Sequence, residues 1–210
     1  MARISRALTR RGFLMTSGGG PGAMEATHVG AWFAHFDDAE MSEAIAVLAR
    51  RPAGAPEGKE YADPDWLSRA YEVRARWPIE NVKFHSLGIP TWLYGHEPPA
   101  AFATQIAKYF ANSVREEGLL AIARYGVVFA RGSAGTIQEI FQDAAQNHYR
   151  SYGVRSPMVL LGGQFWREEA PVWPLLQKVS AGRIYDQLLY LEDDESDVIA
   201  RIVDYDPSRY

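Results

Sequence analysis

The chain of 210 residues is long enough for one domain with a full hydrophobic core, or for one domain that carries an insertion. A formal net charge of −4 argues against a nucleic-acid partner, and the lack of cysteine excludes disulfides, thiolate catalysis and cysteine-ligated metals. No apolar run reaches the length of a membrane span, and the basic residues 1–11 do not resemble a signal peptide. We therefore expect a cytoplasmic protein with no membrane contact.

The first part of the chain predicts a helix, a strand and a second helix. Residues 1–12 carry apolar side chains at helical spacing among arginines, and residues 13–16 suit a strand. A glycine-rich turn follows, Ser17-Gly18-Gly19-Gly20-Pro21-Gly22, and Pro21 suits the first turn of the next helix. That helix carries Met24 and Glu25 and should extend to Phe33.

Residues 35–78 interrupt this pattern, and we interpret them as an insertion or cap. Their spacing predicts helices over 41–50 and 65–77, with a loop over 52–64. The segment also contains aromatic side chains that either form a small core of their own or line a pocket. These are Tyr61, Trp66, Tyr71 and Trp77.

The rest of the chain alternates strands with helices, which predicts a parallel sheet covered on both faces. Strands are expected over residues 89–94, 127–130, 157–161 and 187–191. Helices are expected over 101–111, 114–125, 137–148 and 172–180, with a last helix after the acidic residues 193–197.

These elements together predict one α/β domain over residues 1–210, built on a Rossmann-like, doubly wound parallel sheet. Such a domain normally opens with a strand, whereas this chain opens with the helix that should follow it. We therefore expect the first strand and its loop to be missing from this chain, or to be supplied from upstream.

A second strand–turn–helix unit is centred on Gly132-Ser133-Ala134-Gly135-Thr136. Glycine lets backbone N–H groups approach an anion closely, and a helix N-terminus adds partial positive charge. Both glycine turns are therefore predicted to bind phosphate at the carboxyl ends of their strands. The alternative is that Thr136 and Glu139 only form a capping box, which would make the pattern a structural one.

The order and spacing of these features resemble the Lonely Guy family of phosphoribohydrolases, long mislabelled as lysine decarboxylases. The family pattern Pro-Gly-Gly-x-Gly-Thr-x-x-Glu is similar to Arg131-Gly132-Ser133-Ala134-Gly135-Thr136-Ile137-Gln138-Glu139. Arg131 stands in place of its proline and Ser133 in place of its middle glycine. The family's earlier turn resembles Gly18-Gly19-Gly20-Pro21-Gly22-Ala23-Met24, and its catalytic arginine falls on Arg115. Glu116 stands where the family usually has a lysine.

The resemblance implies hydrolysis of the N-glycosidic bond of a purine or cytokinin nucleoside 5′-monophosphate to free base and ribose 5-phosphate. Glu139 would stabilise an oxocarbenium-like transition state or activate water, and Arg115 would hold the phosphate or favour departure of the base. It also implies a homodimer that needs no metal or redox cofactor. The implied phosphate- and nucleotide-binding residues are Gly18, Gly19, Gly20, Gly22, Met24, Gly132, Ser133, Ala134, Gly135 and Thr136.

Other interpretations remain open. Arg131, Ser133 and Glu116 depart from the family pattern, which fits a non-catalytic sensor or carrier that binds a nucleotide or another phosphorylated ligand. Without its first strand, the chain could also be a folded remnant with no function of its own. Arg115 could be a surface arginine paired with Glu116 or Glu117.

Several further residues are weaker candidates. Glu25 could contact a ribose or only favour the start of its helix, and Asn112 with Ser113 could contact ligand or cap a helix. His28 and His35 share a helix, but no carboxylate cluster completes a metal site. His96 and Glu97 could lie at a site rim. The lysines lie outside both glycine turns, which argues against a pyridoxal-phosphate decarboxylase.

Overall fold

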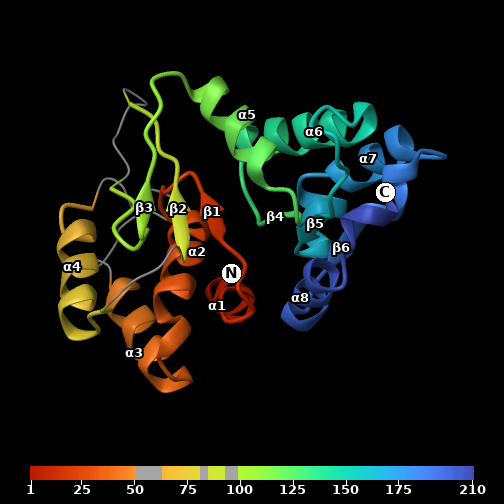
Figure 1. Cartoon of the computed structure of the whole chain (residues 1–210). Helices are drawn as coiled ribbons and strands as arrows, with labels where there is room; N and C mark the ends of the chain where they lie inside the picture. Colours follow the sequence, from red (N-terminus) through yellow and green to blue (C-terminus); the bar gives the residue numbers. More distant parts are fainter. Residues whose placement is uncertain (51–62, 81–84, 93–98) are drawn as a thin grey trace. The chain divides into compact units, whose positions relative to one another are not determined.

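The computed structural model describes residues 1–50, 63–80, 85–92 and 99–210 (Figure 1). The chain divides into two compact units, Met1–Arg115 and Glu116–Tyr210. Each unit contains a three-stranded parallel sheet with helices packed against it. The protein therefore has the Rossmann-like α/β fold that the sequence predicts.

The sheet of the first unit has the order β1-β2-β3, with β1 at Met15–Ser17, β2 at Ser86–Gly88 and β3 at Gln105–Ile106. β1 runs parallel to β2 with Met15 opposite Ser86, and β2 runs parallel to β3. β1 is an edge strand, and no strand precedes it within the part of the chain that the structure describes. With three strands, this sheet is smaller than a complete doubly wound sheet.

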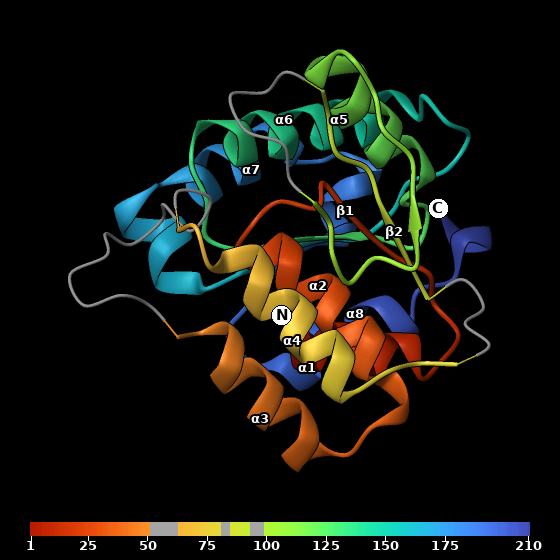
Figure 2. The same cartoon turned by 90° about the vertical axis from the view of Figure 1, so that its left-hand side faces the viewer.

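Four α-helices lie in the sequence around these strands: α1 (Ala2–Thr9), α2 (Ala23–Trp32), α3 (Asp38–Leu48) and α4 (Trp66–Arg76). A short 3₁₀ helix, η1 (Phe33–His35), follows α2. The helices predicted over 1–12, 41–50 and 65–77 are confirmed as α1, α3 and α4. Figure 2 looks onto α3 and α4, which pack against each other and share one apolar core with α2.

The aromatic residues of the predicted insertion do not form a core of their own. Trp77 is buried in the same core as Phe33, with ring centroids 5.7 Å apart. Trp66 is buried as well, whereas Tyr71 is exposed. Tyr61 and most of the predicted loop lie outside the described residues. The segment therefore extends the core of α2, and the expectation of a separate satellite core is wrong.

The second unit has the sheet order β4-β5-β6, with β4 at Val127–Phe129, β5 at Met158–Leu161 and β6 at Leu189–Glu192, all parallel. Its helices are α6 (Ala134–Tyr149), α7 (Val172–Ser180) and α8 (Glu195–Val203), with the shorter η3 (Phe165–Glu169), η4 (Ile184–Leu188) and η5 (Pro207–Arg209). α5 (Asn112–Ile122) crosses from the first unit into the second.

Both faces of β5 are covered, as a doubly wound sheet requires. Met158 and Leu160 belong to a buried cluster with α6, α7 and η3. Val159 points to the opposite face because side chains alternate along a strand, and it is also fully buried. On the side of α8, Ile202 comes so close that a Cβ atom at Gly126 would lie 2.6 Å from its Cδ1.

Two elements predicted between residues 89 and 111 differ from the structure. The strand expected over 89–94 lies earlier, at Ser86–Gly88, with only an isolated bridge at Thr91. The helix expected over 101–111 is instead a turn followed by β3. Thr104 explains the second error, because its hydroxyl donates to the carbonyl of Ser86 (2.9 Å) and accepts from the Ser86 N–H (3.1 Å). These long-range bonds hold the segment extended despite its helical spacing.

Candidate functional site

The first glycine turn joins β1 to α2, and the side chain of Ser17 stabilises it through hydrogen bonds. The Ser17 hydroxyl donates to the carbonyl of Met24 (3.0 Å) and accepts from the N–H of Gly19 (3.2 Å). Its oxygen also lies 2.8 Å from Nε2 of His28. One hydroxyl therefore ties together the end of the strand, the turn and the first turns of the helix.

His28 supports the turn as a neutral side chain. It is buried, and burial lowers its pKa to about 4 because the charged imidazolium would lose its hydration. With Ser17 donating to Met24, the Nε2–H of His28 donates to the Ser17 oxygen. Its Nδ1 then has no hydrogen-bond partner among the described residues. His28 is thus a structural group of the turn.

Close contacts explain why the first turn consists of glycines. A Cβ atom at Gly19 would lie 2.7 Å from Cβ of Ala100, and one at Gly20 would lie 2.6 Å from Cε of Met24. Gly19 and Gly22 also have positive φ angles of 73° and 72°, which L-residues disfavour. Gly22 is the N-cap of α2, so Pro21 lies before the helix, and its predicted place in the first helical turn is wrong.

Arg115 reaches this turn from α5. A Cβ atom at Gly18 would lie 3.0 Å from Nη1 of Arg115, and also 3.0 Å from Sδ of Met24. The other guanidinium nitrogen, Nη2, donates to Oδ1 of Asn112 (2.6 Å). The structure thus brings Gly18, Met24, Asn112 and Arg115 together, although Arg115 lies far along the sequence from the turn. A fixed cation beside a glycine-rich backbone can bind an anion.

A carboxylate also lies at the start of α2. Glu25, in the first turn of that helix, accepts hydrogen bonds from Nε1 of Trp66 with both oxygens, at 2.9 and 3.1 Å. Trp66 belongs to α4, so the predicted insertion orients Glu25. The sequence identified Glu25 as a candidate but not its partner, because nothing local links two residues that come together only in the fold.

The second glycine turn joins β4 to α6. The helix begins at Ala134, with Ser133 as N-cap and no side-chain cap bond. Thr136 and Gly135 therefore lie inside the first helical turn, and the capping-box alternative for Thr136 and Glu139 is wrong. Thr136 packs over Gly132 so closely that a Cβ atom at Gly132 would lie 2.1 Å from its Oγ1.

The N-terminus of α6 is open to ligand. A Cβ atom at Gly135 would meet no atom within 4 Å, and Ser133 and Ala134 are exposed. The first backbone N–H groups of the helix lack a capping side chain. Glu139 follows in the second helical turn and is half-buried. The local geometry is therefore an exposed helix N-terminus, a feature that can bind an anion, with a carboxylate one turn further on.

Two of the three residues that depart from the family pattern, Arg131 and Glu116, have partners within the second unit. Arg131 forms an ion pair with Glu169, with Nη2 2.7 and 2.6 Å from its two carboxylate oxygens. Its guanidinium also lies 4.8 Å from the ring centre of Phe165. Glu116 is buried and accepts a hydrogen bond of 2.7 Å from Nε2 of Gln138. Both side chains therefore have hydrogen-bond partners in the fold.

One buried acidic residue was not identified as a candidate from the sequence. Asp143, on α6 one turn after Glu139, is fully buried, and burial raises its pKa to about 8. Its Oδ1 lies 3.4 Å from Nδ2 of Asn147, and its Oδ2 has no partner among the described residues. Asp143 is therefore neutral at pH 7. An apolar helix face at this position predicts only core packing, which is why sequence reasoning overlooked it.

The structure describes some of the remaining candidates but not all of them. His35 is not joined to His28 but faces His85. His96 and Glu97 lie outside the described residues. Over residues 1–50, 63–80, 85–92 and 99–210, no group of three or more His, Asp or Glu side chains has the arrangement of a metal site. In the same ranges no helix is long and apolar enough to cross a membrane.

The two parallel sheets, with a glycine turn and a helix directly after β1 and after β4, define a Rossmann-like α/β protein with two candidate anion-binding turns. A comparison with protein-family models found no match, and a search of the curated proteins found none either.

Proposed function

We propose that the protein hydrolyses the N-glycosidic bond of a purine or cytokinin nucleoside 5′-monophosphate, giving the free base and ribose 5-phosphate. The observation that carries the proposal is the place of Arg115 at the backbone of Gly18. Two features that the family resemblance selects, the first glycine turn and Arg115, are neighbours there although they lie far apart in the sequence. A cation beside glycine backbone N–H groups supports the binding of a phosphate monoester.

In the proposed reaction, backbone N–H groups of the first glycine turn hold the phosphate, and Arg115 adds a positive charge that Asn112 orients. As the glycosidic bond breaks, positive charge develops on the ribose ring. The carboxylate of Glu139 stabilises that charge or activates the attacking water. In this proposal Glu25, which Trp66 orients, binds a ribose hydroxyl.

The test is release of free base from a panel that includes AMP and a cytokinin riboside monophosphate, followed by chromatography. Glu139→Gln should lower kcat on the order of a hundredfold to a thousandfold, because the amide carries no charge. Glu117→Gln is the matched control, since Glu117 is exposed and accepts a hydrogen bond from the hydroxyl of Tyr152. No turnover on the whole panel, or equal losses in both variants, would disprove the enzyme proposal.

A second candidate is a protein of the same fold that binds a nucleotide without cleaving it. Glu116 favours it, because a buried acid bonded to Gln138 replaces the basic residue that the family places beside its catalytic arginine. Thermal shift separates the candidates, because ligand binding stabilises the folded state whether or not chemistry follows. Stabilisation by AMP without release of adenine would support the binding protein.

We also propose, on the family resemblance alone, that the protein forms a homodimer. Light scattering coupled to size-exclusion chromatography measures the mass directly. A monomeric mass across the concentrations used for the activity assay would refute this part of the proposal.

A further inference from the structure

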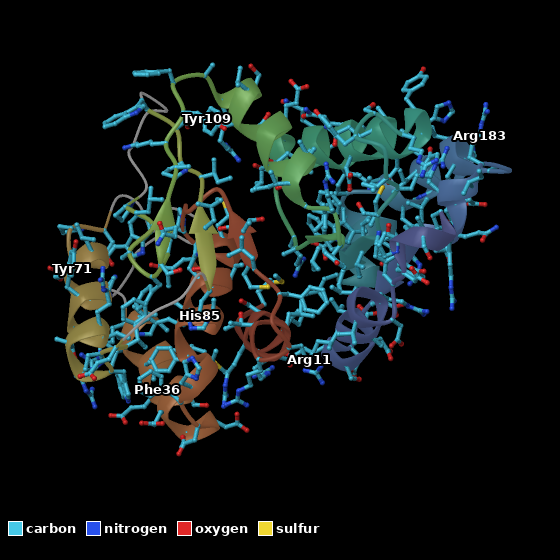
Figure 3. All side chains as sticks on the ribbon, in the orientation of Figure 1. Arg11, Phe36, Tyr71, His85, Tyr109 and Arg183 are labelled. Carbon is cyan, nitrogen blue, oxygen red and sulfur yellow. The ribbon has the colours of Figure 1, made fainter. Side chains whose placement is uncertain are left out.

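Two histidines from separate segments of the first unit face each other through the same ring atom. His35 ends η1, His85 directly precedes β2, and their Nε2 atoms lie 3.2 Å apart. The ring centroids are 5.1 Å apart and the ring planes cross at 63°. Figure 3 labels His85 in the first unit, together with Phe36, the residue after His35. We propose that the two Nε2 atoms bind one divalent transition-metal ion, with solvent completing the coordination shell.

The separation of the two nitrogens suits a shared metal ion. With metal–nitrogen bonds of about 2.05 Å, two nitrogens 3.2 Å apart subtend an angle of about 103° at the metal. This angle is close to tetrahedral and also near the right angle of tetragonal copper or nickel sites. Both imidazoles could therefore bind without a change of backbone.

The backbone at both histidines is already fixed. Arg10 donates hydrogen bonds of 2.8 Å to the carbonyls on both sides of His35. The N–H of His85 donates to the hydroxyl of Thr104 (3.2 Å), and its carbonyl accepts from Met15 (3.1 Å). The backbone at both histidines is therefore ordered before a metal binds, so binding costs little conformational entropy.

The ligand chemistry of the pair also favours a metal, because an imidazole nitrogen that carries no proton offers a lone pair to a metal ion. No third His, Asp or Glu joins them among the described residues. Nitrogen ligands alone favour copper, nickel and zinc over magnesium and calcium.

The test is titration calorimetry of the full, untagged chain with CuCl₂, NiCl₂ and ZnCl₂, with MgCl₂ as the comparison. We expect one ion per chain, and loss of affinity by at least about a hundredfold in His35→Gln or His85→Gln, because a single imidazole cannot chelate. His148→Gln, which removes a half-buried histidine of the second unit, is the control and should bind as the wild type does.

Electron paramagnetic resonance of the copper-loaded protein gives an independent result. Hyperfine splitting from two equivalent nitrogens supports the site, and splitting from one nitrogen or none overturns it. Absence of saturable binding, or unchanged affinity in the two variants, also overturns the proposal. His35 is exposed, so His35→Gln should fold and decides the matter if His85→Gln does not. These results do not depend on any nucleotide activity.

Discussion

At the scale of single residues, the buried carboxyl of Asp143 is the clearest departure from ordinary core chemistry. A carboxylate is rarely buried without a cation, because the charged form loses its hydration. Among the described residues Asp143 has one long contact, with Asn147, and burial favours the neutral acid and raises the pKa to about 8. The unfolded chain, with a pKa near 3.8, releases this proton much more readily.

This difference in pKa predicts a pH-dependent cost. The stability that the neutral acid contributes is complete below pH 3.8 and is lost as the pH rises towards 8. Asp143→Asn stays neutral throughout, so we expect it to raise the free energy of unfolding at pH 8 on the order of 2 kcal/mol or more, with little change at pH 4. Urea unfolding at both pH values measures this. Asp204→Asn, at an exposed position, is the control, and an equal effect of Asp143→Asn at both pH values would contradict the argument.

At the scale of elements, the sequence predicted those parts of the fold that local pattern determines. β4 and α6 follow from a short apolar run and from helical spacing. β4 lies where expected, whereas α6 begins at Ala134, earlier than the predicted start at residue 137. β3 could not be predicted, because Thr104 is held extended by bonds to Ser86 that only the folded chain contains. Arg115 was predicted from the family resemblance, and its bond to Asn112 was not.

The same limit applies to the contacts that complete the candidate site. The indole of Trp66 reaches Glu25 from a segment that the sequence marked only as an insertion. Glu116 stood out in the sequence only as a departure from the family pattern, and its hydrogen bond from Gln138 forms only in the fold. Tertiary neighbours of this kind leave no periodicity, so they lie beyond sequence patterns.

The packing of α1 on α2 yields a prediction about elements. A Cβ atom at Gly30 would lie 2.1 Å from the carbonyl oxygen of Ala2 and 2.9 Å from the backbone nitrogen of Arg6. Backbone atoms cannot move aside cheaply, so we expect Gly30→Ala to destabilise the protein by about 1–3 kcal/mol despite the better helix propensity of alanine. Gly135→Ala is the matched helical control, because its Cβ would meet nothing within 4 Å. Denaturant unfolding should show a loss for the first and none for the second; equal midpoints would refute the packing argument.

At the scale of the whole molecule, each unit carries a buried titratable group, and the two groups change the stability of their units in opposite directions as the pH changes. In the first unit, His28 is kept neutral with a pKa of about 4, below its ordinary value of 6.5. Its contribution to stability is therefore present above pH 6.5 and is lost as the pH falls towards 4. Asp143, in the second unit, behaves in the opposite way, since its contribution is lost as the pH rises towards 8.

The two units should consequently respond to pH in opposite directions. Hydrogen exchange followed by mass spectrometry, corrected for the intrinsic pH dependence of exchange, resolves peptides from each unit separately. Between pH 8 and pH 5 we expect protection to fall in peptides around β1 and α2, because the unfolded first unit gains a proton on His28 that the folded unit excludes. Over the same interval protection should rise around α6, because the folded second unit retains the proton on Asp143. Asp143→Asn should abolish the second response and leave the first unchanged. Parallel changes in both units would show instead that the chain opens as one cooperative body, in which these two buried groups do not act locally.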